Sequence, residues 1–162
     1  MAVLTYSART AWARYLLSRP LYLAIGKGKD SWDTTPETAD YEAMALVHEI
    51  GRKKITQAYF VNEDDNGDIE MPGGRRYSYS EKPTRHIYLG CMFNYGEGVA
   101  VPIREVGVFI DVQPKAGLQA GQTFFTPSEI QNQGTLLLLE HLDTPDIFTP
   151  KRKGYYGTVL TI

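Results

Sequence analysis

The sequence predicts a mainly β (α+β) protein: an antiparallel β-sandwich or barrel-like domain with an N-terminal helix and one further short helix. Three observations favour this fold class. Several segments alternate between apolar and polar residues, as half-buried antiparallel strands do. The chain contains 15 glycines, 9 prolines and 11 tyrosines, which suits short strands joined by turns. Helical periodicity is confined to the first third of the chain.

The first helix is predicted over residues 7–18, with Ser7 as its N-cap. Pro20 ends it, because a proline ring disfavours helical geometry at the preceding residue. An apolar stripe runs along this helix at the expected spacing. The stripe includes Trp12 and Tyr15 and must be buried, either on its own domain or on another subunit. Its members are Ala8, Ala11, Trp12, Tyr15 and Leu16.

A second, shorter helix is predicted over residues 40–50, and a two-residue period follows it. Alternation in residues 104–112 indicates a half-buried strand, whereas residues 136–142 are apolar on both faces and indicate a central strand. The pair Asn66 and Gly67 predicts a type I′ hairpin turn, in which both residues have positive φ. Further strands are predicted over residues 21–25, 53–61, 68–71, 75–80, 86–95, 123–125 and 155–162.

The length of 162 residues predicts one domain, 1–162, in which residues 1–19 form a helical segment and residues 20–162 a β-rich body. A net charge of −2 predicts no binding to nucleic acid. No apolar run approaches the ~20 residues of a membrane span, so no membrane association is expected. The single cysteine, Cys91, excludes an intrachain disulfide and suits the reducing cytoplasm.

No catalytic, metal or cofactor site is predicted. The acidic segment 62–73 has the spacing of an EF-hand loop but lacks the bidentate glutamate at its end. The spacing of His48, His86 and His141 brings no two of them onto one metal. Cys91 lies on the apolar face of its strand, where its thiol is expected to be inert. Because no nucleophile, base and orienting group can be assembled, we expect no enzymatic activity.

Three stretches carry a family resemblance. They are residues 20–28 (PLYLAIGKG) with 32–36 (WDTTP), residues 45–55 (ALVHEIGRKKI), and residues 103–111 (IREVGVFID). Together they resemble virion tail proteins of contractile-tailed bacteriophages (myoviruses) and Mu-like prophages. The third stretch also resembles the attachment domains of phage tail-collar and tail-fibre proteins. Residues 126–137 are similar to a region of longer baseplate-associated relatives.

The resemblance implies a structural component of a bacteriophage contractile tail or baseplate, with the small ripcord-type baseplate proteins as one candidate. It implies that the partners are other tail or baseplate proteins and that the chain forms a homo-oligomer or ring. The implied location is the virion, after synthesis in the host cytoplasm. A fibre adaptor is expected to continue into a long shaft, whereas this sequence stops at Ile162, so a compact component is expected.

Four residues are predicted as interface anchors: Trp32, Arg152, Tyr155 and Tyr156. Aromatic and arginine side chains carry much of the binding energy at protein interfaces. The alternative function is a carbohydrate-binding or receptor-binding module that holds its ligand on exposed tyrosines. Because neighbours in a strand point to opposite faces, about half of these tyrosines would point inward. The candidate tyrosines are Tyr77, Tyr79, Tyr88, Tyr95, Tyr155 and Tyr156.

Overall fold

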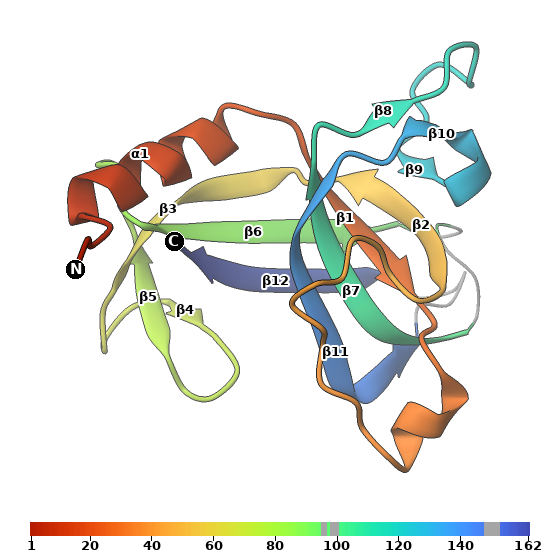
Figure 1. The fold of residues 1–162 in the computed structure, drawn as a ribbon, viewed down its shortest axis with the longest axis horizontal. Helices are drawn as coiled ribbons and strands as arrows, with labels where there is room; N and C mark the ends of the chain where they lie inside the picture. Colours follow the sequence, from red (N-terminus) through yellow and green to blue (C-terminus); the bar gives the residue numbers. More distant parts are fainter. Residues whose placement is uncertain (95–96, 98–100, 148–152) are drawn as a thin grey trace. The chain divides into compact units, whose positions relative to one another are not determined.

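The computed structural model describes residues 1–94, 97, 101–147 and 153–162. The chain divides into two compact units. Strands hold 44% of the residues and helices 13%, which confirms the predicted mainly β fold with an N-terminal helix (Figure 1). That the chain folds as a single domain stays a prediction. The smaller unit comprises residues 1–19, 56–90 and 156–162, and the larger unit comprises residues 20–55 and 91–155.

The helical elements are α1 (Tyr6–Leu17) and two short 3-10 helices, η1 (Asp30–Asp33) and η2 (Pro127–Glu129). The strands of the first half are β1 (Leu21–Gly26), β2 (Glu49–Lys54), β3 (Gln57–Glu63), β4 (Ile69–Glu70), β5 (Arg76–Tyr79) and β6 (His86–Phe93). Those of the second half are β7 (Pro102–Ile110), β8 (Gln113–Pro114), β9 (Phe124–Phe125), β10 (Ile130–Asn132), β11 (Thr135–Ile147) and β12 (Gly154–Thr161).

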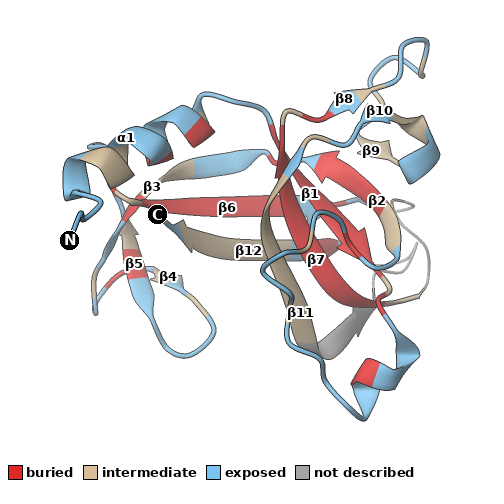
Figure 2. Ribbon diagram, viewed as in Figure 1, coloured by how far each residue is buried: buried red, intermediate tan, exposed pale blue. Residues whose placement is uncertain are grey.

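The larger unit is built on a five-stranded antiparallel sheet with the order β11-β7-β1-β2-β9. A small sheet of β10 and β8 accompanies it. β1 and β7 lie inside the large sheet and are buried on both faces (Figure 2). Leu23, Ile25, Val108 and Phe109 from these two strands are almost fully buried, so the core of this unit lies around them.

The predicted positions of two strands in this sheet are wrong. The strand predicted as half-buried over residues 104–112 is β7, an interior strand that is buried on both faces, and the predicted central strand over residues 136–142 is the edge strand β11. Polar residues of β7 suggested a face toward water, but Arg104 and Glu105 are buried and find their partners inside the protein. The leucines of β11 at 136–139 are only half-buried, because β11 has a neighbouring strand on one side alone.

The predicted helix over residues 40–50 is also wrong. Residues 40–48 form a loop, and β2 begins at Glu49 to pair with β1. A helix needs its backbone N–H groups for its own carbonyls, whereas the N–H groups of Val47 and His48 donate to the Glu105 carboxylate. The short helix that the structure does contain in this region is η1.

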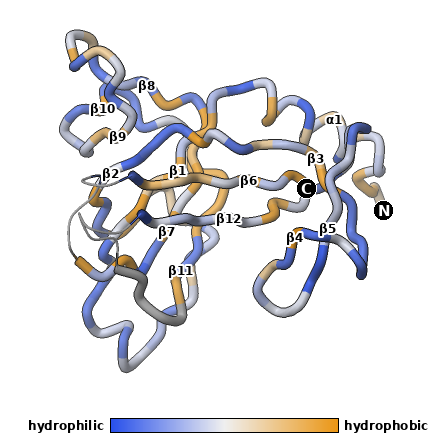
Figure 3. Tube along the Cα trace, turned by 180° about the vertical axis from the view of Figure 1, so that it is seen from behind, coloured by the Kyte–Doolittle hydropathy of each residue, from blue (hydrophilic) through white to orange (hydrophobic). Residues whose placement is uncertain are grey.

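The smaller unit contains most of the second five-stranded sheet, with the order β12-β6-β3-β5-β4. The hydrophilic segment between β3 and β4 stands out in Figure 3. The predicted type I′ turn within it is wrong, because neither Asn66 nor Gly67 has positive φ and β5, not β4, pairs with β3. Gly67 is needed for space, since a Cβ there would lie 2.2 Å from the Tyr77 carbonyl oxygen. The tight turn joins β4 to β5 at Gly73, whose φ is +86°.

α1 begins one residue earlier than predicted. Its N-cap is Thr5 rather than Ser7, and the Thr5 hydroxyl accepts a hydrogen bond of 3.2 Å from the Ala8 N–H. Both residues have a hydroxyl suited to capping, but only one side chain is placed to bind the first free N–H groups. The helix ends at Leu17, three residues before Pro20.

His86 in β6 is held in its neutral form by its neighbours. Its Nδ1 lies 2.8 Å from the Thr161 hydroxyl, and its Nε2 accepts a hydrogen bond of 3.1 Å from Arg85. Burial lowers the pKa of His86 below its ordinary value of 6.5, and the Arg85 charge lowers it further. The folded protein therefore takes up this proton at lower pH than the unfolded chain does.

We expect the protein to lose stability as the pH falls through 6.5, the ordinary pKa of histidine, toward the lower pKa of folded His86. Above that range the contribution is fully present. Thermal unfolding between about pH 7.5 and 5.5 measures it. His86→Gln should flatten the dependence, whereas His48→Gln, at an exposed histidine, should leave it unchanged. Equal slopes for wild type and His86→Gln would contradict the assignment.

Candidate interaction surfaces

Glu105 fixes the position of two loops in the larger unit. Its side chain is fully buried, and its carboxylate accepts hydrogen bonds from the N–H groups of Gly28 at 3.2 Å, Val47 at 2.9 Å and His48 at 2.7 Å. Such charge-assisted bonds to backbone donors are stronger than neutral ones. Glu105 thus holds the loop after β1 and the loop before β2 at the same end of β7.

Arg104, the neighbour of Glu105, ties η1 to the sheet. Its guanidinium donates to both carboxylate oxygens of Asp33, at 2.7 and 2.8 Å, and to the carbonyl of Lys27 at 3.0 Å. A second carboxylate, that of Asp30, lies 2.9 Å away. The hydrogen bond from Arg104 lowers the pKa of Asp33. Arg104 and Glu105 are neighbours in β7 and therefore lie on opposite faces of the strand, where each holds a different part of the fold.

Residues 40–47, which we name the acidic loop, present large apolar side chains to the outside. Tyr41 is 94% exposed and Met44 76% exposed. The loop is anchored beneath them, because Leu46 is buried in the cluster that contains Phe109. A groove of about 350 Å³ lies between this loop and residues 136–139 of β11. The acidic loop, although named for Asp40 and Glu42, therefore also presents exposed apolar side chains in the larger unit, and Leu46 anchors it to the core.

α1 presents a second apolar surface, in the smaller unit. Ala13 and Leu16 are its buried residues, whereas Trp12 is 56% exposed and Tyr15 48% exposed. The rings of Trp12 and Tyr15 meet edge to face at 6.1 Å. The two large rings of the predicted stripe are therefore only half covered by the described part of the chain. We name this side of α1 the helix face; it comprises Ala8, Ala11, Trp12 and Tyr15.

The predicted anchors lie in different settings. Trp32 is 6% exposed, and its ring stacks on His141 at 4.0 Å. Tyr155 is partly exposed and Tyr156 is half-buried, and each already contacts other residues. Arg152 lies outside the described residues. Their role at an interface stays a prediction.

The tyrosines of the alternative function do not form one exposed platform. Tyr77 and Tyr88 are buried, and Tyr88 takes part in the cluster around Val61. Tyr79 in β5 is exposed. Tyr95 lies outside the described residues. A sugar ring needs an open aromatic face on which to stack, and Tyr77 and Tyr88 do not offer one.

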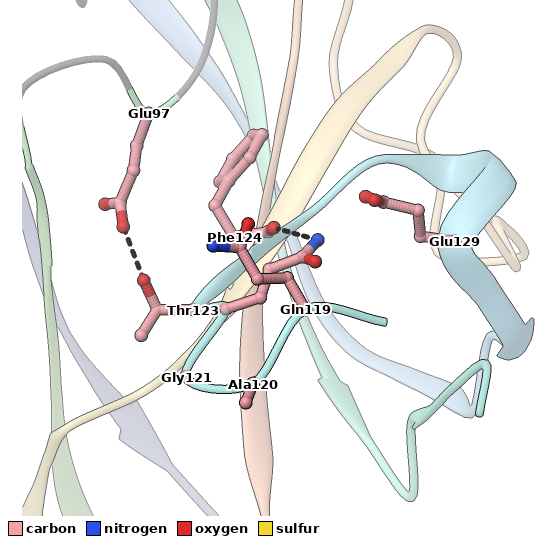
Figure 4. Close-up of a pocket in the computed structure, with 8 residues that line it drawn as sticks. Glu97, Gln119, Ala120, Gly121, Thr123, Phe124 and Glu129 are labelled. Carbon is pink, nitrogen blue, oxygen red and sulfur yellow. Dashed lines mark hydrogen bonds between the residues drawn. The ribbon is translucent and has the colours of Figure 1, made fainter. Parts of the chain in front are cut away.

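A hollow of about 500 Å³ between η2 and the loop before β9 is lined by polar groups that already have partners. Figure 4 shows Glu97 and Thr123 pointing toward one another, joined by a hydrogen bond of 2.5 Å. Glu97 also pairs with Lys53, again at 2.5 Å. The Glu129 carboxylate accepts from the N–H and hydroxyl of Thr126. These carboxylates are occupied in building the fold.

The pKa shifts of Cys91 and Asp64 are explained by their place in the fold. Burial raises the pKa of the Cys91 thiol to about 12, so it stays protonated at neutral pH. Asp64, in the segment after β3, accepts a hydrogen bond from the Ser78 hydroxyl. This bond is the main reason that the pKa of Asp64 is lowered. Within the described ranges no group of three or more potential metal ligands occurs. In that same part of the chain no helix is long and apolar enough to cross a membrane.

The acidic loop was not predicted as an interaction surface from the sequence. The apolar spacing of Tyr41 and Met44 suited one side of the helix that does not form. One feature of the sequence could have indicated this surface: residues 40–47 combine large apolar side chains with two acidic ones. The helix face was found from its spacing, because α1 does form.

Comparison with known proteins identifies the family of the chain. No curated protein matches it. A family model described as "Baseplate wedge 3 tail fiber network component" matches residues 1–158. This match confirms the expectation of a bacteriophage baseplate protein in the virion tail. Assignment to Mu-like phages, to ripcord-type proteins or to tail-collar domains stays a prediction. Because the match spans nearly the whole sequence, the chain belongs to the family of baseplate wedge 3 tail fiber network components.

Proposed function

We propose that this protein is a structural subunit of the baseplate that acts through subunit–subunit contacts in a symmetric assembly. The observation that carries the proposal is the helix face. Trp12 and Tyr15 expose about half of their surface, and exposed aromatic pairs of this kind are typical of interfaces. Membership of a baseplate family supports other baseplate proteins as partners.

The proposal includes homo-oligomer formation and excludes catalysis, nucleic-acid binding and membrane association. The paired state of Arg104, Glu105 and Glu97 supports a role for these charges in the fold rather than in a reaction. The raised pKa of Cys91 supports an unreactive thiol. A net charge of −2 supports a protein partner rather than nucleic acid.

Deletion of the gene from its phage tests the proposal. We expect particles without a functional baseplate, restored when the wild-type protein is supplied in trans. Cryo-electron microscopy of restored particles should show density for this chain in a ring around the baseplate. Complementation by Tyr79→Ala, at an exposed tyrosine outside both surfaces, is the matched control. Normal particles without the gene, or particles that lack the chain, would contradict the proposal.

A further inference from the structure

The helix face and the acidic loop have complementary composition. Residues 1–19 contain three arginines and no acidic residue, whereas the acidic loop contains two acidic residues and no basic one. Both surfaces also hold large exposed apolar side chains. The rest of the chain, residues 20–162, has 14 basic and 19 acidic residues, because all but three of the 17 basic residues lie there.

The charges beside the two surfaces are available for a partner. Within the described residues, Arg14, Asp40 and Glu42 form no ion pair. The Asp40 carboxylate accepts a hydrogen bond from the Glu42 N–H, and the Glu42 carboxylate accepts one from the Tyr41 hydroxyl. Arg14 is exposed beside the helix face, whereas Arg9 is half-buried and lies on the packed side of α1 with Ala13 and Leu16. Asp40 and Glu42 stand on either side of Tyr41 in the sequence. Each surface is thus apolar with charged residues of one sign beside it.

We propose that the helix face of one copy docks on the acidic loop of a second copy of this chain. In this contact Trp12 and Tyr15 pack against Tyr41 and Met44, and a ring enters the groove between the loop and β11. Arg14 lies against the acidic side chains. The inference rests on the proposed function and names the surfaces that would join equivalent subunits.

Pairing of like surfaces is disfavoured by charge. Helix face against helix face would bring Arg14 of both copies together, and loop against loop would bring Asp40 and Glu42 together. Like charges at close range oppose association, whereas opposite charges steer it and fix its register. Contact between two different surfaces leaves each copy with one of each still free, so it repeats from copy to copy until a ring closes or a filament forms.

The experiment uses the full-length protein in sedimentation velocity over a range of concentrations. The helix variant carries Trp12→Ala and Tyr15→Ala, and the loop variant carries Tyr41→Ala and Met44→Ala. We expect wild type to self-associate and each variant alone to be monomeric, with the contact weakened by about 30-fold or more. Tyr79→Ala is the control and should associate like wild type.

An equimolar mixture of the two variants separates this arrangement from a symmetric one. The intact loop of the helix variant should accept the intact helix face of the loop variant, which gives a dimer and nothing larger. A charge exchange provides a second test. Arg14→Glu should weaken association, and adding Asp40→Lys with Glu42→Lys to the same chain should restore it.

Three results would overturn the inference: wild type that remains monomeric at every concentration, a loop variant that still dimerises alone, or a mixture that forms no dimer. A monomeric wild type would also contradict the homo-oligomer part of the proposed function. The other two results would overturn the inference alone, and the presence of the chain in the virion is tested separately by deletion and microscopy. Circular dichroism checks that the variants are folded. We expect both variants to unfold at the same denaturant concentration as wild type, because all four replaced side chains are exposed.

Discussion

Glu105→Ala is expected to lower the free energy of unfolding by about 3–5 kcal/mol. The carboxylate is fully buried and accepts three backbone N–H groups, from Gly28, Val47 and His48. Alanine removes the acceptor of one buried N–H, that of Gly28, and of two partly buried ones, those of Val47 and His48. A hydrogen bond to a charged group contributes about 1.5–3 kcal/mol. It also opens a cavity beside Gly26, where a Cβ would lie 2.5 Å from a Glu105 oxygen. Denaturant unfolding followed by circular dichroism measures the loss.

Two further variants show whether the hydrogen bonds are the cause. Glu105→Gln keeps the shape but offers one acceptor oxygen in place of two, so its loss should fall between wild type and Glu105→Ala. Glu81→Ala replaces an exposed glutamate and should change stability by less than about 0.5 kcal/mol. Hydrogen exchange at the amides of Val47 and His48 should accelerate in Glu105→Ala. A loss below about 1 kcal/mol would show that the loops are held by other contacts.

The case of β7 shows which part of the fold can be predicted from sequence. Alternation located the strand, because a period of two depends on local geometry alone. Its place in the sheet depends on partners distant in the chain, such as Asp33 for Arg104. A charged residue that faces water and one that is paired inside the protein look the same in a sequence. The sequence therefore predicts the central strand over residues 136–142 instead.

The prediction of a helix over residues 40–50 was wrong for a related reason. Helical spacing in a short segment is a weak preference that tertiary contacts override, and here the competing contact is Glu105, more than 50 positions later in the sequence. α1 forms where it was predicted, one residue earlier. The candidate surfaces show the same limit of sequence reasoning. Spacing identified the apolar stripe of α1, whereas the exposure of Trp12 and Tyr15 among the described residues is seen only in the structure.

The second large effect concerns Trp32, one of two tryptophans in the chain. Trp32→Ala is expected to lower the free energy of unfolding by about 3–5 kcal/mol, as is usual for removal of a buried tryptophan. Its ring stacks on His141 at 4.0 Å and fills the space beside Gly28, where a Cβ would lie 2.4 Å from the ring. Denaturant unfolding by circular dichroism measures this, and Trp32→Phe should lose less because it keeps a stacked ring.

Trp12→Ala is the matched comparison, because it removes the same side chain from an exposed position. We expect its free energy of unfolding to stay within about 0.5 kcal/mol of wild type. Emission spectra support the distinction: the remaining tryptophan of Trp12→Ala should emit at shorter wavelength than that of Trp32→Ala while both are folded. If Trp32→Ala were as stable as wild type, the ring would have no structural role and its prediction as an interface anchor would gain weight. If Trp12→Ala unfolded readily, the helix face would belong to the core of this chain and not to an interface.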